Sequence, residues 1–272
     1  MSTTEQAPVG VDPNIPSTAR IYDYLLGGKD NFASDRAAAE AVLNMLPESR
    51  QMAKDNRAFL GRAVRHLAES GITQYLDIGA GLPTQENVHQ VALAANPDAR
   101  IVYVDNDPIV LVHARALLAG NPNTTVLKGD LHSPDEIIDA AAEHLDFTKP
   151  VAVLLVAVLH FFPDDEETYA IVDSIRARLA PGSAVVVSHV HVGDYSTQVV
   201  DEGKAVYATT ATGSLVGRTT PQVRRYLEGT TVLEPGVVPV EAWHPEHGEV
   251  EIDLTKAGVL GGVGIVSEPA LP

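Results

Sequence analysis

The spacing of apolar residues changes along the chain and divides it into three regions. Residues 1–16 hold three prolines and show little periodicity, which indicates a flexible N-terminal arm. Residues 17–70 carry apolar positions at helical spacing, as at Val64 and Leu67, and predict a helical N-terminal cap. Residues 71–272 begin with short apolar runs separated by helix-like stretches, which is the order expected of a parallel sheet covered by helices.

The individual elements follow from local signals. Ser17 is expected to cap the first helix, and Gly27 and Gly28 to end it. The expected helices of the cap are 18–26, 34–46 and 48–70. The expected strands are 72–78, 100–104, 124–128, 151–156 and 184–190, with helices at 84–95, 108–120, 133–144 and 164–179 between them.

The pattern changes after residue 190. There we expect helices at 195–208 and 221–227, and β-like pieces at 231–233, 237–240 and 259–266. Two of these pieces are expected to pair as an antiparallel hairpin on the sheet edge. The predicted fold class is therefore α/β, a Rossmann-like, doubly wound, seven-stranded mixed sheet with a helical N-terminal cap, in which residues 71–272 form the larger domain.

The charge and the cysteine content of the chain limit the kinds of molecule that it is expected to bind. The chain has 19 basic and 36 acidic residues and a net charge of −17, which repels nucleic acid and anionic membranes at long range. Arg218, Arg224 and Arg225 form a small basic cluster that we interpret as a solvated helix face. The absence of cysteine excludes a disulfide framework and thiolate chemistry, and it fits a cytoplasmic protein. We expect neither a nucleic-acid partner nor a membrane partner.

One glycine turn carries the strongest chemical signal. Tyr75 to Gly81 closes the first strand and opens a helix, and the next strand ends on Asp105. Gly79 and Gly81 allow the backbone to turn sharply and to approach a ligand without a Cβ. The helix start offers free N–H groups, and the Asp105 carboxylate can accept hydrogen bonds from two ribose hydroxyls. This layout is typical of a site for an adenosine-bearing cofactor.

Two cofactor classes compete for this turn. A nicotinamide dinucleotide site has a third glycine for the pyrophosphate, but that position is Thr84, beside Pro83. Asp77, two residues before Gly79, would lie beside the pyrophosphate, where a carboxylate is unfavourable. S-adenosylmethionine has no phosphate, and it carries an ammonium and a sulfonium group that an acidic residue can stabilise. The turn therefore favours S-adenosylmethionine.

Further strand ends extend the expected cofactor site. Asp130, after the third strand, can accept a hydrogen bond from the adenine amine. Asp77, Gly79, Gly81, Asp105 and Asp130, in this order and spacing, resemble the class I S-adenosylmethionine-dependent methyltransferases over about residues 72–190. The neighbouring residues expected to complete the cofactor site are Ala80, Asn106, Leu131 and Ala157.

Histidines at strand ends are candidates for acid–base chemistry. His160 follows the fourth strand on the usual substrate side of such a sheet, and we take it as the candidate catalytic base. Packing in the loop is the alternative. His189 and His191 share a face at the end of the fifth strand, but two histidines without a spaced third ligand do not make a metal motif. We expect no metal.

The N-terminal block gives a more specific resemblance. Pro16 to Phe32, with the sequence PSTARIYDYLLGGKDNF, resembles the signature of the S-adenosyl methyltransferase family of actinobacteria, formerly a domain of unknown function. The runs 56–60 and 233–236 fit that family too, so the resemblance covers nearly the whole chain. It implies a class I methyltransferase fold, an S-adenosylmethionine site and a helical cap, without naming an acceptor. From its many polar side chains we expect this block to fold over the cofactor, with Tyr22 and Asn31 in the wall of the site.

The function predicted from these observations is S-adenosylmethionine-dependent methyl transfer to a small-molecule acceptor. A non-catalytic module that binds S-adenosylmethionine or S-adenosylhomocysteine for regulation is the first alternative. A nicotinamide oxidoreductase is the second, and the missing third glycine argues against it.

Overall fold

The structure is a computed structural model that describes residues 11–83, 86–118 and 120–267. Most of the expected arm at residues 1–16 lies outside the described residues, as does the expected start of a helix at Thr84. Within the described residues no helix is both long enough and apolar enough to cross a bilayer.

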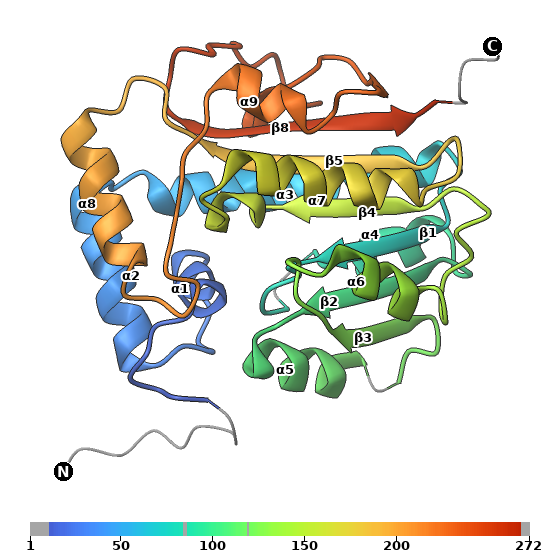
Figure 1. The fold of residues 1–272 in the computed structure, drawn as a ribbon, viewed down its shortest axis with the longest axis horizontal. Helices are drawn as coiled ribbons and strands as arrows, with labels where there is room; N and C mark the ends of the chain where they lie inside the picture. Colours follow the sequence, from blue (N-terminus) through green and yellow to red (C-terminus); the bar gives the residue numbers. More distant parts are fainter. Residues whose placement is uncertain (1–10, 84–85, 119, 268–272) are drawn as a thin grey trace.

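Five parallel strands form the larger part of a central mixed sheet (Figure 1). They are β1 (Gln74–Ile78), β2 (Arg100–Asp105), β3 (Thr124–Lys128), β4 (Ala152–Val156) and β5 (Ala184–His191). Their order is β3-β2-β1-β4-β5, so the chain reverses its direction of winding between β1 and β4. Leu76 of β1 lies opposite Val102 on one side and Val153 on the other. Ligands bind at such a reversal, beyond the carboxyl ends of the strands, and the predicted Rossmann-like fold is confirmed.

The C-terminal strands extend the sheet beyond β5. The strand β8 (Gly258–Val266) runs antiparallel to β5, and both β6 (Thr230–Val232) and β7 (Val238–Pro239) pair antiparallel with β8. The predicted antiparallel pair at the sheet edge is confirmed, with β6 outermost and β8 between β5 and β6. Glycines allow this burial: a Cβ on Gly261 would lie 2.8 Å from the ring of Phe59. Seven strands lie along the main path of the sheet, and the two-residue β7 is an eighth.

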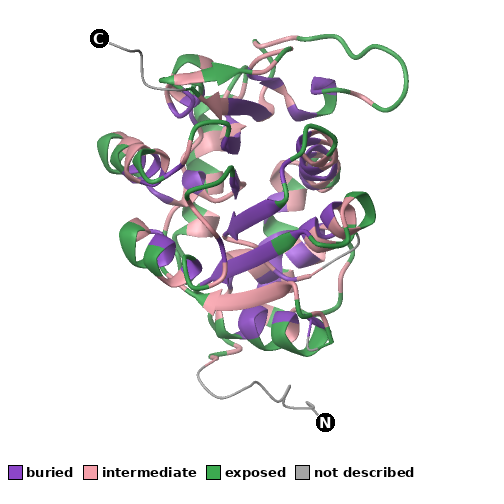
Figure 2. Ribbon diagram, turned by 90° about the vertical axis from the view of Figure 1, so that its right-hand side faces the viewer, coloured by how far each residue is buried: buried purple, intermediate pink, exposed green. Residues whose placement is uncertain are grey.

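Helices cover both faces of the sheet (Figure 2). One face packs on α6, α7 and α9, and the other packs on α3, α4 and α5. The strands between them are buried because side chains on both faces are apolar, as expected of central parallel strands. The covering helices are α3 (Ser49–Glu69), α4 (Val88–Ala95), α5 (Pro108–Leu118), α6 (Pro134–Ala141), α7 (Asp165–Ala177) and α9 (Thr220–Arg225), and the 3₁₀ turns are η1 (Leu159–Phe161) and η2 (Val240–Ala242).

A separate helical cap lies beyond the carboxyl ends of the parallel strands (Figure 1). It consists of α1 (Thr18–Leu25), α2 (Ala33–Met45) and α8 (Thr197–Tyr207). Ile21 and Leu25 of α1 pack against Ala38 of α2 and the first turns of α3, and Val206 of α8 packs against the same cluster. Helix α8, which follows β5 in the sequence, thus packs with the N-terminal helices.

The first helix begins where the sequence indicates, but the Ser17 side chain bonds to the sheet and not to the helix end. Its side chain makes no capping bond to α1. Instead its hydroxyl donates to Asp107 Oδ2 at 2.5 Å, and its backbone N–H donates to the buried Asp35 at 2.8 Å. The expectation of a side-chain cap was wrong because a stronger acceptor, a carboxylate from the sheet, lies within reach.

Candidate active site

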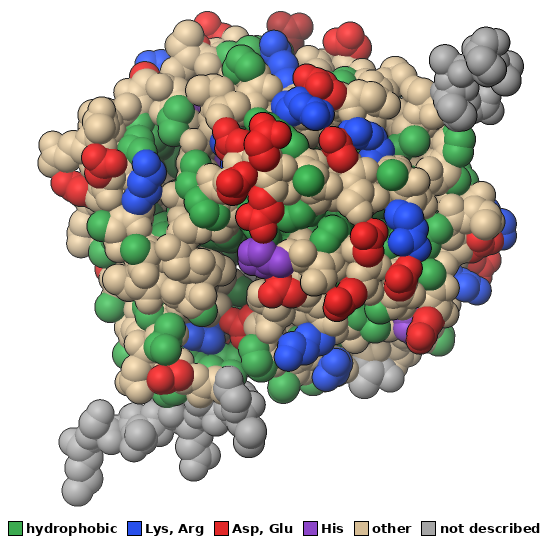
Figure 3. Space-filling view, viewed as in Figure 1, with side chains coloured by type: hydrophobic (Ala, Val, Ile, Leu, Met, Phe, Trp, Pro, Cys, Tyr) green, Lys and Arg blue, Asp and Glu red, His purple; other side chains and the backbone are tan. Residues whose placement is uncertain are grey.

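A single cavity of about 880 Å³ lies between the strand ends and the cap. This volume is near the upper end of what small-molecule sites show and can hold more than one ligand. Figure 3 shows the molecule hollowed on the side where cap and sheet meet. Most of the sequence-predicted site residues line it: Tyr22, Asp77, Gly79, Ala80, Gly81, Asp105, Asn106, Asp130, Leu131, Ala157 and His160.

Asn31 does not line the cavity. Its amide donates to Asp23 Oδ2 at 2.8 Å and to the carbonyl of Gly28 at 3.2 Å, so it holds the turn after α1 in shape. Gly28 itself contacts Asp23 closely, and a Cβ there would overlap the Asp23 carboxylate. Asn31 and Gly28 therefore shape the loop after α1. The expectation that Asn31 forms part of the cavity wall was wrong, because its amide is used within this loop.

The glycine turn after β1 has the left-handed backbone that glycine favours. The φ angles of Gly79 and Gly81 are 75° and 65°. A Cβ at Gly79 would lie 2.7 Å from Val158 Cγ2, so the turn passes close to the end of β4. The Gly81 N–H donates to Asp105 Oδ2 at 2.9 Å, which ties the turn to the end of β2.

The Asp105 carboxylate is buried at the bottom of this corner. Besides Gly81, it accepts the backbone N–H of Asp107 on Oδ1 at 2.9 Å. Burial raises its pKa to about 6, against the lowering effect of these hydrogen bonds. Each oxygen keeps a second lone pair, which is what a ligand hydroxyl needs.

Asp77 lies beside Asp105 and is 4% exposed. Burial raises the pKa of Asp77 to about 7, while the charge of Arg57 lowers it and the charge of Asp105 raises it further. Arg57 offsets part of the negative charge, but two carboxylates at adjacent strand ends still repel one another. The pair therefore fits a positively charged ligand group.

Asp130 and its neighbours form the rim of the same corner. The Asp130 carboxylate accepts the backbone N–H of His132 at 3.0 Å and contacts its ring Nδ1 at 2.7 Å, and these bonds lower the pKa of Asp130. Its side chain is 55% exposed, in contrast to Asp77. The next residue, Leu131, is buried in the core and also lines the cavity.

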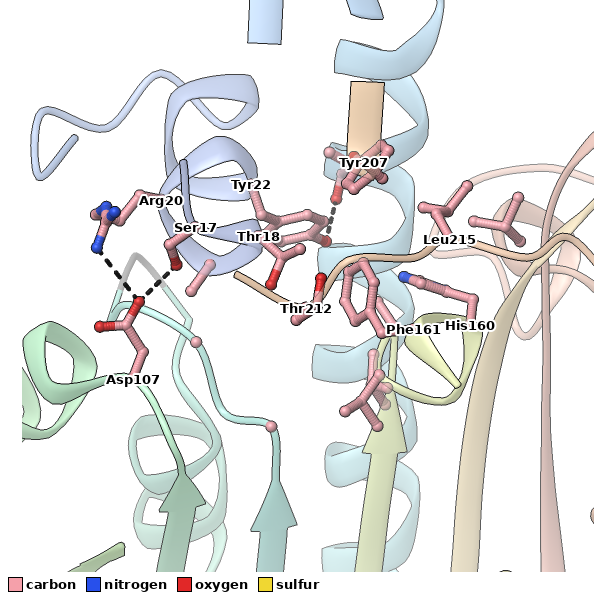
Figure 4. A pocket seen from close by; sticks show the side chains of 18 of the residues that line it. Ser17, Thr18, Arg20, Tyr22, Asp107, His160, Phe161, Tyr207, Thr212 and Leu215 are labelled. Atoms are coloured by element: carbon pink, nitrogen blue, oxygen red, sulfur yellow. Dashed lines mark hydrogen bonds and ion pairs between the residues drawn. The ribbon is translucent and has the colours of Figure 1, made fainter. Parts of the chain in front are cut away.

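Helix α1 is bound to this corner by polar contacts that the sequence analysis missed (Figure 4). Asp107 accepts the Ser17 hydroxyl, and the Arg20 guanidinium lies 3.5 Å from the same carboxylate oxygen. Arg20 also forms a buried ion pair with Asp35 at 2.8 Å. The signal was the N-terminal block itself, in which Ser17 and Arg20 are three residues apart and so share a helix face.

A chain of hydrogen bonds connects the cap with the end of β4. The Tyr22 hydroxyl accepts from Asn56 Nδ2 at 3.0 Å and donates to the carbonyl of Ala53. Asn56 Oδ1 accepts the Ser188 hydroxyl at 2.6 Å, and Ser188 Oγ accepts the N–H of Ala157 at 3.0 Å. Ala157 has a φ of 55°, which is strained for a residue with a Cβ, and this chain holds it there.

His160 is 5% exposed and stands in η1, beside the end of β4. Its Nδ1 is fully buried and has no hydrogen-bond partner among the described residues. Burial lowers the pKa of His160 to about 3, and the charge of Arg218 contributes. At neutral pH the ring is therefore uncharged, and its ring edge faces Phe161 and the cavity (Figure 4).

Arg218 is a buried residue rather than part of a solvated face. It is 1% exposed, and its Nε pairs with Asp165 at 2.8 Å. Its remaining N–H groups donate to Leu159 O, Phe162 O, Thr168 Oγ1 and His189 Nε2. These bonds fix the turn that carries His160. A single sequence shows an arginine near two others, and it does not show that five acceptors surround it.

His189 and His191 have structural partners. His189 Nδ1 contacts the carbonyl of Val190 at 2.7 Å, and its ring stacks on Tyr226. The two ring nitrogens of His191 contact the carbonyls of Arg218 and Leu254. In the described part of the chain no group of three or more potential ligands could hold a metal ion.

The remaining wall comes from segments that carry no motif. The loop 211–217 and helix α8 contribute side chains that include Tyr207 and Leu215, and α3 contributes Met52. Burial and the nearby Tyr22 raise the pKa of Tyr207 to about 12, and the two tyrosines point toward one another (Figure 4). Apolar residues at helical spacing are read as core positions, so nothing in the sequence marks these as ligand contacts.

Comparison with known proteins decides the family. The family described as S-adenosyl methyltransferase matches residues 4–267. This chain belongs to the S-adenosyl methyltransferase family. A candidate methyltransferase from Thermobifida fusca shares 38% identity and a TM-score of 0.88, over 96% of this chain and 98% of its own. A DUF574 family protein from Streptomyces avermitilis shares 36% identity and a TM-score of 0.86, over 94% and 99%. The resemblance stated from the N-terminal block is thereby confirmed.

More distant structures share the fold. The N-methyltransferase NodS from Bradyrhizobium japonicum, in complex with S-adenosyl-L-homocysteine, has 14% identity and a TM-score of 0.50, over 92% of this chain and 100% of its own. No curated protein matches the chain. As a member of its family, the chain is an S-adenosylmethionine-dependent methyltransferase.

The residues in the corner fit S-adenosylmethionine. Asp77 and Asp105 supply buried negative charge for a ligand that carries an ammonium and a sulfonium. The glycine turn lets the backbone approach the ligand, and Asp105 keeps lone pairs for hydroxyls. We refer to Asp77, the turn 79–81, Asp105 and the residues 128–132 as the cofactor corner.

Proposed function

We propose that the enzyme transfers a methyl group to a nucleophilic oxygen or nitrogen atom of a small molecule held beside His160. The observation that carries the proposal is His160, which lines a cavity larger than the cofactor corner and directs a ring nitrogen into it (Figure 4). The cap closes this part of the cavity, which suits a small acceptor better than a polymer. The chain has 36 acidic and 19 basic residues, and this excess of negative charge disfavours nucleic acid as the acceptor.

The residues of the chain act mainly through position and exclusion of water. When bound, S-adenosylmethionine supplies an electrophilic methyl group on a sulfonium sulfur. Helix α1 covers the corner through Ser17 and Arg20 and limits the access of water on this side, while the hollow in Figure 3 leaves a path by which a proton reaches solvent. Alignment of a nucleophile with a methyl carbon gives most of the rate gain in such a reaction.

His160 orients the acceptor in this proposal. Its low pKa leaves the ring neutral at pH 7, so a ring nitrogen can accept a hydrogen bond from the proton-bearing atom of the acceptor. So weak a base does not keep the proton, which passes on to solvent. Arg218 positions the ring by fixing the residues on either side of it.

The test is transfer of label from methyl-labelled S-adenosylmethionine to a pool of small hydroxyl- and amine-bearing compounds. We expect a labelled product and S-adenosylhomocysteine with the wild type and neither with Asp105→Ala. Tight cofactor binding without transfer to any compound of the pool would favour the non-catalytic regulatory module. Absence of cofactor binding would refute the assignment of the corner.

A further inference from the structure

The part of the cavity farthest from the cofactor corner has its own chemical character. We call it the acceptor chamber and define it as the cavity residues of α2, η1, α8 and the loop 211–217, together with Tyr22 and Met52. Aromatic and aliphatic side chains form most of its walls. The rings of Phe161 and Tyr207 lie 6.1 Å apart and tilted by 38°. The side chains of Tyr22 and Leu215 project toward the same space (Figure 4).

Charge is nearly absent from the chamber. Among the described residues of this set, Lys204 is the one with a permanent charge, and it is exposed at the rim. A carboxylate or phosphate bound inside would lose its hydration without meeting a cation, and an ammonium would meet no carboxylate. The chamber therefore selects against charged ligands, in contrast to the corner with its buried aspartates.

One polar group faces the chamber from a buried position. His160 is 5% exposed, and it directs a ring nitrogen toward the chamber (Figure 4). A bound ligand that fills the chamber displaces water from this nitrogen, so the ligand must supply a matching group. A neutral imidazole has one lone pair in the ring plane, which suits a hydroxyl donor. Aromatic walls favour a planar ring as the remainder of the ligand, because rings stack and contact edges at little entropic cost.

We propose that the methyl acceptor is an uncharged aromatic compound with a ring hydroxyl, bound with its ring in the acceptor chamber and its hydroxyl against His160. The inference rests on the proposed methyl transfer and adds the class of substrate. In the reaction the hydroxyl oxygen bonds to the methyl carbon, the carbon–sulfur bond breaks with its electron pair left on sulfur, and the hydroxyl proton passes to solvent. The products are an aryl methyl ether and S-adenosylhomocysteine.

Binding of three matched probes tests the class. The protein is first saturated with S-adenosylhomocysteine and then titrated in a calorimeter with 2-naphthol, 2-methoxynaphthalene and 2-naphthoate. We expect 2-naphthol to bind about tenfold more tightly than 2-methoxynaphthalene, which has no hydroxyl to donate. We expect 2-naphthoate to bind at least about tenfold more weakly than 2-naphthol, because its charge is desolvated.

Two variants separate the chamber from the corner. In His160→Phe, the preference for 2-naphthol over 2-methoxynaphthalene should fall from about tenfold to about onefold. Leu215→Asp places a charge in the chamber, so 2-naphthol should bind at least about tenfold more weakly while S-adenosylhomocysteine binds as in the wild type. Val112→Asp is the matched control, because Val112 is 49% exposed on α5. It should change neither affinity.

The outcomes distinguish the two proposals. If the wild type does not bind S-adenosylhomocysteine, the proposed function fails. If it binds S-adenosylhomocysteine but 2-naphthol does not bind, or if 2-naphthoate binds as tightly as 2-naphthol, the aromatic acceptor is wrong and the cofactor assignment stands. If His160→Phe does not fold, the three probes on the wild type and the Leu215→Asp titration still decide.

Discussion

The cofactor corner and the acceptor chamber are two parts of one cavity that differ in the charge of their buried side chains. The corner buries carboxylates, Asp77 and Asp105, whose pKa values rise to about 7 and about 6. The chamber buries rings and a single neutral imidazole, His160. A cationic ligand would reduce the repulsion between the two carboxylates of the corner, and a hydrogen-bond donor would pair with the His160 ring nitrogen that is directed into the chamber (Figure 4). Buried polar groups without their natural partners thus indicate what a cavity binds.

Helix α1 contacts both halves of the cavity. Loss of its buried ion pair between Arg20 and Asp35 should have the largest effect of the variants considered, and this effect is on the free energy of unfolding. Arg20→Ala leaves Asp35, with a side chain 0% exposed, without its cation. We expect a loss of about 3 kcal/mol or more in the free energy of unfolding, measured by urea denaturation. Arg65→Ala is the control, because its pair with Glu246 is exposed, and it should cost no more than about 1 kcal/mol. Equal effects of the two variants would mean that the buried ion pair between Arg20 and Asp35 does not hold α1 to α2 as described.

The corner is tested by removal of the carboxylate that ties the turn to β2. Asp105→Ala should weaken binding of S-adenosylmethionine by about 100-fold, because charge-assisted hydrogen bonds to the ligand and the support of Gly81 are both lost. Calorimetry gives the affinity, with Asp98→Ala, an exposed residue before β2, as control. Unchanged affinity would show that the cofactor binds elsewhere.

The buried carboxylates of the corner predict that protein stability and cofactor affinity depend on pH in opposite directions. Folding raises the pKa of Asp77 from 3.8 to about 7, so the folded chain binds more protons than the unfolded chain between these values. The stability of the cofactor-free protein should therefore be greatest below about pH 4 as far as this group is concerned, and fall as the pH rises through about 7, by on the order of 4 kcal/mol. Affinity for the cationic cofactor should rise over the same range, because the ionised form binds the ammonium.

Asp77→Asn is the variant that checks this pH dependence. It should unfold at higher urea concentration than the wild type at pH 7.5, without cofactor, and bind S-adenosylmethionine more weakly. Burial lowers the pKa of His160 from 6.5 to about 3, so this residue should make stability rise between these two values, because only the unfolded ring is protonated there. Parallel pH profiles of stability for Asp77→Asn and wild type would contradict the assignment.

Substitution of Asp130, at the rim of the corner, should have the smallest effect on cofactor affinity. Asp130 is 55% exposed, so water competes for its hydrogen bonds. Asp130→Asn should weaken cofactor binding by about threefold at most, in the same calorimetric titration. A loss as large as that of Asp105→Ala would mean that the corner is drier in the complex than in the cofactor-free structure.

Residues near the glycine turn could be predicted because strand ends of a parallel sheet meet at one edge. Asp77, Gly79, Gly81 and Asp105 all line the cavity as expected from their positions after strands. Asn31 was placed in the wall because it is polar and lies in the family signature, yet its amide is used within its own loop. Composition identifies a polar segment, whereas the direction of each side chain depends on which acceptor lies nearest.

The chamber could not be predicted for a different reason. Its walls come from α2, η1, α8 and the loop 211–217, which are far apart in the sequence and read as ordinary core or surface positions. Arg218 was interpreted as a surface residue, since an arginine is rarely buried without several partners. Its partners come from Leu159 to His189 and are assembled only when α7 and β5 pack together.

The sequence by itself determined the winding of the sheet, the position of the glycine turn and the carboxylates at the strand ends, because these depend on local periodicity and on residues a few positions apart. Only the tertiary structure decided that β8 lies inside the sheet, that α8 joins the N-terminal helices, and that His160 is buried without a partner. These features depend on packing between distant segments, where close contacts such as that of Gly261 with Phe59 select one arrangement. The donor of the methyl group was therefore evident from local signals, and the kind of acceptor could be inferred only from the packed cavity.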